Sequence, residues 1–319
     1  MKFEPNLKTV LWGGEKIATL KGLSLPPGRT IGESWEVSGL TGRESVVSSG
    51  RDAGLTLRQL ISRYRGHLVG NRVYRRFGNE FPLIIKFIDA RSDLSVQVHP
   101  GDNLALERHG CSGKAEMWYI IEADDDAALY AGNCRELSPD EMADCLSRHD
   151  IGAELRRHTT APGDCFFLPA GTLHSIGAGN LLLEVQQASD ITYRVWDYDR
   201  LDGNGQPREL HTHLAVDAID YANMTGDRRI DYDRDSATVT LVNSPYFTVG
   251  RLMLDSTSPQ TVAMPYDAFL VIVNIDGEAV INADNAKPAT LHRGETILIP
   301  ADTRSLTATG RATLITATV

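Results

Sequence analysis

The sequence predicts a mainly β protein built from two β-barrel units, with a few short helices inserted in its N-terminal part. Two observations carry this prediction. Most apolar segments are only about four to eight residues long and are separated by Gly, Pro, Asn and Asp, which is typical of a protein made of short strands. A segment near the middle of the chain also recurs near its end, which indicates a duplicated structural unit.

The expected strands fall into two groups along the chain. The first group is Leu83–Ile88, Glu116–Ile121, Cys165–Leu168, Leu181–Gln186 and Tyr193–Trp196. The second is Thr238–Val242, Phe269–Ile275, Glu278–Asn282, Glu295–Ile299 and Ala312–Thr318. A charged linker, Asp227–Asp235, precedes the second group. We therefore predict a unit of residues 1–230 and a C-terminal unit of residues 231–319.

Helical patterns are confined to the first unit. Leu57–Val69 carries apolar residues at helical spacing with charges between them. A second helix is expected from Ser138 to Arg148, because Ser138, the following proline and Glu141 form the pattern of a capping box. A further short helix is expected near Glu154.

The recurring segment spans residues 163–174 and 294–305, at a constant offset of 131. Both copies read Gly, acid, any residue, three apolar residues, Pro, Ala, any residue, Thr. A weaker alignment sets Glu116 near Ala268. Since His174 corresponds to Ser305, a metal site in the first unit would be lost in the second.

Composition excludes several classes of protein. The 319 residues carry a formal charge of −10, so a role that depends on binding nucleic-acid phosphates is not expected. No apolar run approaches the roughly 20 residues that span a bilayer, and the N-terminus has no apolar signal region. The four cysteines show no CxxC spacing, so we expect free thiols and a cytoplasmic protein.

The run from Leu94 to Pro100 alternates apolar and polar residues. As a strand, it would bury its apolar side chains on one face and place Ser95, Gln97 and His99 together on the other. An amide oxygen and an imidazole two residues apart can bind one metal ion. The alternative is a half-exposed strand that contains a histidine by chance.

Two more residues could complete a metal site with Gln97 and His99. These are Glu116, in an otherwise apolar strand, and His174, which follows a Pro-Ala-Gly turn. Two imidazoles, a carboxylate and an amide suit Zn²⁺, and Fe²⁺ or Mn²⁺ would tolerate the same set. The alternatives are a solvated strand residue for Glu116 and a turn histidine for His174.

The chain resembles the type I mannose-6-phosphate isomerases of the short bacterial form, which are cupin-fold enzymes. The resemblance rests on the segments Trp12–Gly14, Gly32–Ser38, Pro82–Ala90, Leu94–Pro100, Gly113–Glu116, Pro169–His174 and Ser189–Arg200. It implies two cupin-type (jelly-roll) barrels and one Zn²⁺ per chain, held by Gln97, His99, Glu116 and His174. It also implies that Arg194 is the active-site arginine, and it places Ser95, Lys86, Lys114, Glu184 and Asp190 in or near the substrate pocket.

The implied reaction is the interconversion of mannose 6-phosphate and fructose 6-phosphate through an enediol. Arg194 stays protonated, so we assign it to a substrate oxyanion or phosphate, with an ion pair to Asp197 or Asp199 as the alternative. Glu184 is a candidate base, because its apolar neighbours predict burial and a raised pKa. The alternative is a structural carboxylate paired with an arginine.

Lysines and a serine complete the expected pocket. Lys114 could hold a substrate oxygen or relay a proton. A buried Lys86 needs an anion, and a substrate phosphate or a carboxylate such as Asp89 would serve. Ser95 could donate to that phosphate. The base stays open between Glu184, Lys114 and a metal-bound water.

Two other functions fit part of the same pattern. A non-catalytic cupin would bind the sugar phosphate without turnover, and an Fe²⁺ oxygenase would use a face of two histidines and one carboxylate. Gln97 as a fourth ligand and Lys86 favour the isomerase. We expect a phosphosugar substrate, no nucleic-acid or membrane partner, and a monomer or homodimer.

Overall fold

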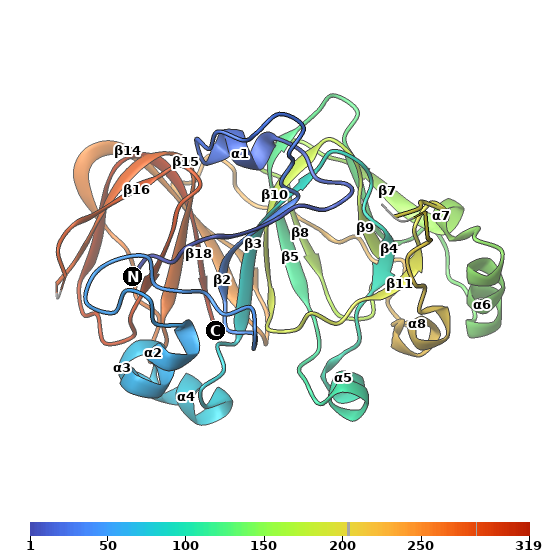
Figure 1. The fold of residues 1–319 in the computed structure, drawn as a ribbon, viewed down its shortest axis with the longest axis horizontal. Coiled ribbons are helices and arrows are strands. Elements are labelled where there is room, and N and C mark those ends of the chain that lie inside the picture. The colour runs from blue at the N-terminus through green and yellow to red at the C-terminus, as the bar shows by residue number, and fades with distance from the viewer. Residues whose placement is uncertain (203–204, 285) are drawn as a thin grey trace.

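Three antiparallel sheets form the body of the protein in a computed structural model that describes residues 1–202, 205–284 and 286–319 (Figure 1). The seven-stranded sheet has the order β1 (Asn6–Lys8), β2 (Glu33–Ser38), β3 (Leu83–Ala90), β10 (Asn180–Gln187), β5 (Glu116–Ala123), β8 (Cys165–Leu168) and β12 (Arg229–Ile230). The five-stranded sheet has the order β11 (Tyr193–Trp196), β4 (Val96–Val98), β9 (His174–Ile176), β6 (Ala128–Asn133) and β7 (Leu155–Thr159). The six-stranded sheet runs β13 (Thr238–Asn243), β14 (Thr248–Thr261), β18 (Leu306–Thr318), β15 (Leu270–Ala283) and β16 (Ala289–His292), and β17 (Thr296–Ile299) also pairs with β15.

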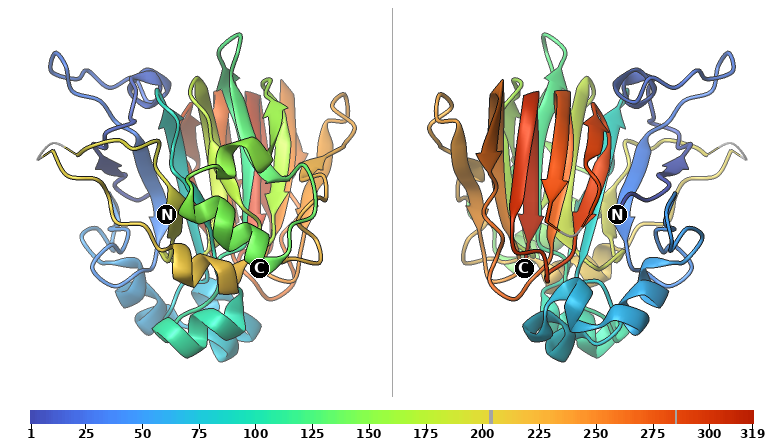
Figure 2. Two further views of the ribbon diagram at one scale, coloured as in Figure 1. Left: turned by 90° about the vertical axis from the view of Figure 1, so that its right-hand side faces the viewer. Right: turned by 90° about the vertical axis from the view of Figure 1, so that its left-hand side faces the viewer.

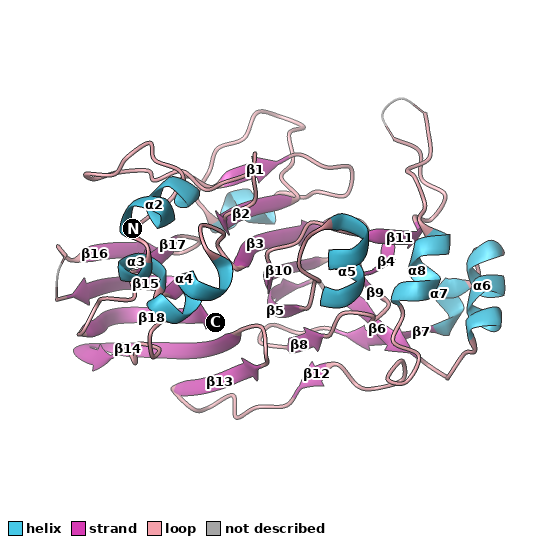
Figure 3. Cartoon of the chain, turned by 90° about the horizontal axis from the view of Figure 1, so that it is seen from below, coloured by secondary structure: helices cyan, strands magenta, loops and turns pink. Residues whose placement is uncertain are grey.

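The helices of the described chain all lie before residue 219. They are α1 (Lys16–Leu20), α2 (Leu57–Tyr64), α3 (Gly66–Val69), α4 (Asn71–Phe77), α5 (Asp102–His109), α6 (Pro139–Ser147), α7 (Ile151–Glu154) and α8 (Thr212–Ala218). Helices α2 to α5 lie below the sheets in Figure 1, and α6 to α8 cover the end of the five-stranded sheet (Figure 3). The prediction of a mainly β protein with helices in its N-terminal part is confirmed.

The seven-stranded sheet lies between the other two sheets. One face contributes Ile85 and Phe87 to a core shared with Val271 and Val273 of the six-stranded sheet. The opposite face contributes residues such as Trp118 to a core shared with the five-stranded sheet. Figure 2 shows the C-terminal strands stacked against the green strands of the first unit. The interior between the seven- and five-stranded sheets is therefore closed off from the C-terminal unit by a wall of β-sheet.

Several expected elements have different bounds in the structure. The helix expected over 57–69 is broken into α2 and α3, because Arg65 adopts a φ of 50°. The strand expected over 94–100 is only Val96–Val98. The segments Phe269–Ile275 and Glu278–Asn282 form one strand, β15, with a register shift between Asn274 and Asp276 instead of a turn. Strand β14 lay outside the expected set because turn-forming residues interrupt its apolar pattern.

The internal repeat is present at the level of individual hydrogen bonds. Before β8, the Asp164 amide donates to Ala161 O, and before β17 the Glu295 amide donates to His292 O. Each acidic side chain also accepts a hydrogen bond from the backbone amide three residues earlier. The donor is Ala161 for Asp164 and His292 for Glu295. The pairing of β5 with β8 matches that of β15 with β17, and it aligns Glu116 with Leu270. The sequence alignment of Glu116 with Ala268 was therefore wrong by two residues, although it placed the residue on the correct face.

The charged linker joins the two units through the first unit's sheet. Its strand β12 pairs with β8, and Arg229 and Arg234 form ion pairs with the buried carboxylate of Asp164. The six-stranded sheet begins with β13, at Thr238. A division at residue 230 stays a prediction, because one apolar core extends across both units.

Candidate active site

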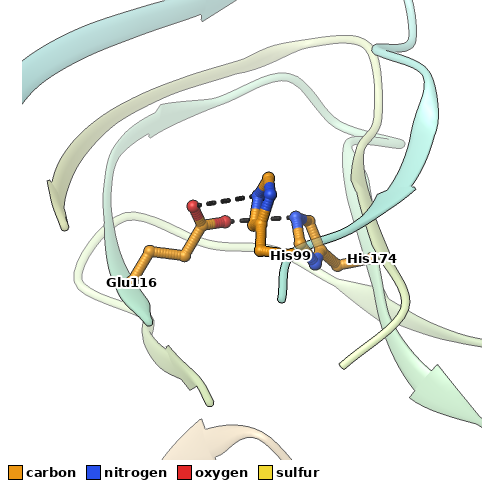
Figure 4. A group of neighbouring side chains, drawn as sticks. All are labelled: His99, Glu116 and His174. Carbon is orange, nitrogen blue, oxygen red and sulfur yellow. Dashed lines mark ion pairs between the residues drawn. The ribbon is translucent and has the colours of Figure 1, made fainter. Parts of the chain in front are cut away.

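His99, Glu116 and His174 meet in the interior between the seven- and five-stranded sheets (Figure 4). The Nε2 atom of His99 lies 3.4 Å from Glu116 Oε2, and Nε2 of His174 lies 3.2 Å from Glu116 Oε1. All three side chains are buried. One carboxylate thus faces two imidazoles from the opposite sheet.

The sheet register brings these residues together from distant parts of the sequence. Glu116 is the first residue of β5, His174 is the first residue of β9, and His99 directly follows β4. Gln97 pairs with His174 across β4 and β9, so both side chains point to the same face. The Gln97 amide nitrogen lies 3.3 Å from His174 Nε2, and a 180° rotation of the amide places its oxygen there instead.

Hydrogen bonds to the main chain orient both imidazoles. His99 Nδ1 lies 2.9 Å from Ile191 O, and His174 Nδ1 lies 2.8 Å from Thr172 O. A carbonyl only accepts, so each Nδ1 carries the proton and each Nε2 keeps its lone pair. Burial, together with the charge of Lys114, lowers the pKa of His99 to about 3, and burial also lowers the pKa of His174. Both rings are therefore neutral at neutral pH.

The electrostatic surroundings keep Glu116 ionised. Burial alone would raise the pKa of this carboxyl, but the neighbouring charge of Lys114 lowers it well below its usual value. Apart from the ion pair with Lys114, neither buried carboxylate oxygen takes part in a hydrogen bond with the described part of the chain. Two unprotonated Nε2 atoms and an anionic carboxylate, all within 4.8 Å of one another, suit a divalent cation.

Lys114 lies on the face of the strand that carries Glu116. Its ammonium nitrogen is 2.9 Å from His99 Nε2 and 3.0 Å from Glu116 Oε2, and the side chain is buried. Lys114 therefore contacts two of the residues that are expected to bind a metal ion.

Lys86 and Glu184 form a buried ion pair deeper in the same interior. Their Nζ and Oε2 atoms are 2.7 Å apart, and the indole Nε1 of Trp118 donates to Glu184 Oε1 at 3.0 Å. Burial raises the pKa of Glu184, and the nearby charge of Glu116 raises it further, while Lys86 acts in the opposite direction. Glu184 is paired with a lysine and not with an arginine. Asp89 accepts amide hydrogen bonds at the start of α1 and is not the partner of Lys86.

Arg194 lies next to Gln97, one of the four residues expected to bind a metal ion. It pairs with Gln97 across β11 and β4, and its Nε donates to Ser95 Oγ at 3.3 Å. The alternative of an ion pair with Asp197 or Asp199 is not observed, because Arg200 and Arg208 bind Asp197 and His149 binds Asp199. Burial and the neighbouring arginines, of which Arg208 acts most strongly, lower the pKa of Arg194.

Asp190 lies outside this cluster. Its exposed carboxylate forms an ion pair with Arg43 and lines a separate cleft of about 900 Å³. Two site residues that sequence reasoning missed are Trp35 and Glu33, which face the same interior as Lys86. The Lys86 nitrogen is 5.5 Å from the centre of the Trp35 ring, whose Nε1 donates to Glu33. Their alternation in the segment Gly32–Ser38 was the available signal.

Comparisons with known proteins agree along the whole chain. A family profile described as the catalytic domain of type I phosphomannose isomerase matches residues 1–119, and one described as the mannose-6-phosphate isomerase cupin domain matches residues 237–319. The chain is 37% identical to mannose-6-phosphate isomerase ManA of Bacillus subtilis, over 93% of this chain and 92% of that protein. It is 34% identical to mannose-6-phosphate isomerase of Streptococcus mutans, over 91% of this chain and 89% of that protein.

Solved structures match the fold as well. The crystal structure of mannose 6-phosphate isomerase from Bacillus subtilis superposes with a TM-score of 0.88 at 34% identity, covering 100% of this chain and 99% of that chain. A phosphomannose isomerase variant from Salmonella typhimurium superposes with a TM-score of 0.81 at 16% identity, covering 99% of this chain and 98% of that chain. At that identity the second match shows the fold alone.

Proposed function

The chain belongs to the type I mannose-6-phosphate isomerase family and is an isomerase, and from this premise we propose that it interconverts mannose 6-phosphate and fructose 6-phosphate with the help of one Zn²⁺. The observation that carries the proposal is the arrangement of Glu116 against two neutral histidines, with a second buried carboxylate, Glu184, in the same interior. The first set suits a metal ion, and the second residue suits a proton acceptor.

Gln97, His99, Glu116 and His174 would hold the ion. A bound Zn²⁺ would polarise the oxygens on C1 and C2 of the sugar or orient the sugar. The two Nδ1 hydrogen bonds to main-chain carbonyls support this assignment, since they fix the ring orientation that ligation needs.

Proton transfer would use the buried side chains around that centre. The reaction moves one proton between C2 and C1 and one between the two oxygens, so the sugar is neither oxidised nor reduced overall. Glu184 is our first candidate for the carbon-bound proton, because burial raises its pKa towards neutral pH. Lys114 is the second candidate, or the group that steadies the enediol oxygens, since its ammonium points to the same centre.

Lys86 has a different role in this proposal from the phosphate contact expected at first. Its ammonium lies 2.7 Å from Glu184, so it can orient that carboxylate. Arg194 lies beside Ser95 and can bind an anionic oxygen of the substrate. Asp190 stays a predicted site residue, which would act from the exposed cleft that it lines.

The two competing functions, a non-catalytic sugar-binding protein and an oxygenase, would require different residues in the same interior. A sugar-binding protein without turnover has no need of a buried carboxylate of raised pKa beside the ligand set. An oxygenase is disfavoured by membership of an isomerase family. Within the described residues, no helix is long and apolar enough to cross a bilayer. We further propose a cytoplasmic enzyme, active as a monomer or homodimer.

The test is a coupled assay of mannose 6-phosphate conversion, run together with exchange of the C2 proton into deuterated solvent. We expect turnover with exchange in the native protein. Glu184→Gln should lose both by at least about 100-fold, which is the size of a missing acid–base group. Binding of the sugar phosphate without exchange would contradict the proposal. Loss of exchange in Lys114→Met but not in Glu184→Gln would transfer the base role to Lys114.

A further inference from the structure

A second group of charged side chains lies next to Arg194. The buried carboxylate of Asp197 is bound by two arginines, Arg200 and Arg208. Arg208 uses both Nε and Nη2 for this contact, with Nε at 2.6 Å from Oδ2. Such a two-point contact fixes the plane of the guanidinium group as well as its position.

This group is continuous with the proposed metal site. Arg194 donates from Nη1 to the carbonyl of Glu209, the residue next to Arg208, at 2.9 Å. From Nε it donates to Ser95, which directly precedes β4 and lies two residues before Gln97. Arg194 therefore connects the group around Asp197 with the segment that carries Gln97.

The three arginines differ in which guanidinium nitrogens lack a hydrogen bond to the described part of the protein. Arg200 contacts the Asp93 and Asp197 carbonyls and the Asp197 carboxylate through Nη1, Nε and Nη2. Arg208 makes no hydrogen bond through Nη1, and Arg194 makes none through Nη2, with any described residue. Within the described residues, Arg194 and Arg208 each keep one terminal nitrogen without a hydrogen-bond partner, whereas every guanidinium nitrogen of Arg200 makes at least one hydrogen bond.

The charges of the group do not balance. Two guanidinium groups bind the one buried carboxylate of Asp197, and Arg194 lies beside them without an ion pair to it. The carboxylate of Glu209 lies in solvent. Burial would raise the pKa of Asp197, but hydrogen bonds from Arg208 and Arg200 lower it overall, so this residue stays an anion. The excess positive charge suits a dianion such as a phosphate monoester.

We propose that Arg208, positioned by Asp197, binds the substrate phosphate together with Arg194 and Ser95, and so makes the enzyme selective for phosphorylated sugars. The inference rests on the proposed function for the identity of the sugar, but the anion site itself does not depend on it. Lys86 does not serve this role, because its ammonium is paired with Glu184.

The chain supplies a matched control for this arrangement. The buried Asp164 is also held by two arginines, Arg229 and Arg234, at the linker between the units. The other terminal nitrogen of Arg234 donates a hydrogen bond to the carbonyl of Pro162, at 3.1 Å. Arg234→Ala therefore removes a similar contact to a buried aspartate without removing a free donor next to Arg194.

The experiment compares Arg208→Ala, Arg208→Lys and Arg234→Ala in the metal-loaded enzyme. For each variant, kcat and KM are measured with mannose 6-phosphate, and the dissociation constant of inorganic phosphate is measured by calorimetry. Arg208→Ala should raise KM and the phosphate dissociation constant in parallel, each by at least about tenfold, with kcat changed less than about threefold. Arg208→Lys should give a smaller rise in both, and Arg234→Ala should change neither.

An unchanged KM and an unchanged phosphate affinity in a folded Arg208→Ala protein would overturn the inference. If that variant does not fold, Arg208→Lys decides, because it keeps the charge but loses the two-point contact with Asp197. Equal losses in Arg234→Ala would also overturn it, since they would indicate a general effect on stability. If the native protein fails to convert mannose 6-phosphate, the proposed function fails, whereas the calorimetric comparison still tests the anion site.

Discussion

The two units of this protein share a backbone frame but differ in what they bury. Both contain the same turn, followed by a strand that pairs in the same register with β5 or β15. In the first unit the interior positions on this frame are occupied by Glu116 and Trp118, and in the second by Leu270 and Ile272. The polar site is therefore a property of side chains placed on the frame, and the frame alone does not create it.

The difference extends to the neighbouring strands. The Glu184–Lys86 pair of β10 and β3 corresponds by register to Thr316 and Gly250 of β18 and β14. Burying charge requires a partner, and in the first unit Lys86 lies against Glu184 and Lys114 lies against Glu116. The second unit fills its interior with aliphatic side chains, which need no partners.

The largest effect is expected from removing a metal ligand in one unit and the matching residue in the other. His174→Ala should abolish bound zinc and lower kcat/KM by at least about 1000-fold, because ligand and orientation are lost together. Ser305→Ala, at the equivalent position, should leave both unchanged. Metal analysis and steady-state kinetics on the two variants check this, and equal activity in His174→Ala would remove the basis of the comparison.

A large loss of stability is expected when the buried ion pair is broken. Lys86→Met leaves the Glu184 carboxylate buried without its partner and should cost about 3–5 kcal/mol of unfolding free energy. Replacing both residues, as Lys86→Met with Glu184→Leu, should recover most of this stability but no activity. Thr316→Val in the second unit should change stability by less than about 1 kcal/mol. Denaturant unfolding distinguishes these outcomes, and a stable single variant would show that the pair is not buried in solution.

Asp89, which corresponds to Met253 in the second unit, should give the first unit a dependence of stability on pH. Burial raises the pKa of its carboxyl from 3.8 to about 6, although amides of Ile17 and Lys16 act against this. The folded protein then binds more protons than the unfolded chain between these values, so stability falls as pH rises through this window.

The variant Asp89→Asn removes this titration. Its unfolding free energy, relative to the native protein, should rise by up to about 2 kcal/mol between pH 4 and pH 6.5 and stay constant above. Unfolding curves recorded across that range check the sign. A difference that shrinks with rising pH would mean that the amide hydrogen bonds outweigh burial.

The smallest effect is expected in the helices that only the first unit carries. Ser138 accepts the amide of Glu141, whose side chain accepts the amide of Ser138, so α6 begins with a capping box. Ser138→Ala should cost about 1 kcal/mol of stability and leave kcat and KM unchanged. A loss of activity would show that α6 contributes to the site as well as to the fold.

The sequence predicted those features that depend on local pattern. The capping box of α6 and the repeat at residues 163–174 and 294–305 are confirmed, because neighbouring residues determine both. The break at Arg65 could not be predicted, since a positive φ at an arginine depends on tertiary contacts. The bounds of β4 likewise depend on its neighbours β9 and β11.

The proposed site was predictable to a similar extent. Alternation placed Gln97 and His99 on one face, but only the sheet register shows that Glu116 meets both histidines. The partner of Lys86 depends on the pairing of β3 with β10, which brings Glu184 opposite, while Asp89 turns to α1. Arg208 was missed because its role depends on a contact with Asp197, which no sequence motif encodes.

The central claim is that one metal ion, held only in the first unit, is required for isomerisation. The most direct test measures bound zinc and turnover in the same preparation, first after removal of metal by a chelator and then during stepwise return of Zn²⁺. The account predicts that activity is lost with the metal and returns in proportion to bound zinc, reaching a plateau at about one ion per chain. Full turnover in the metal-free protein would contradict it.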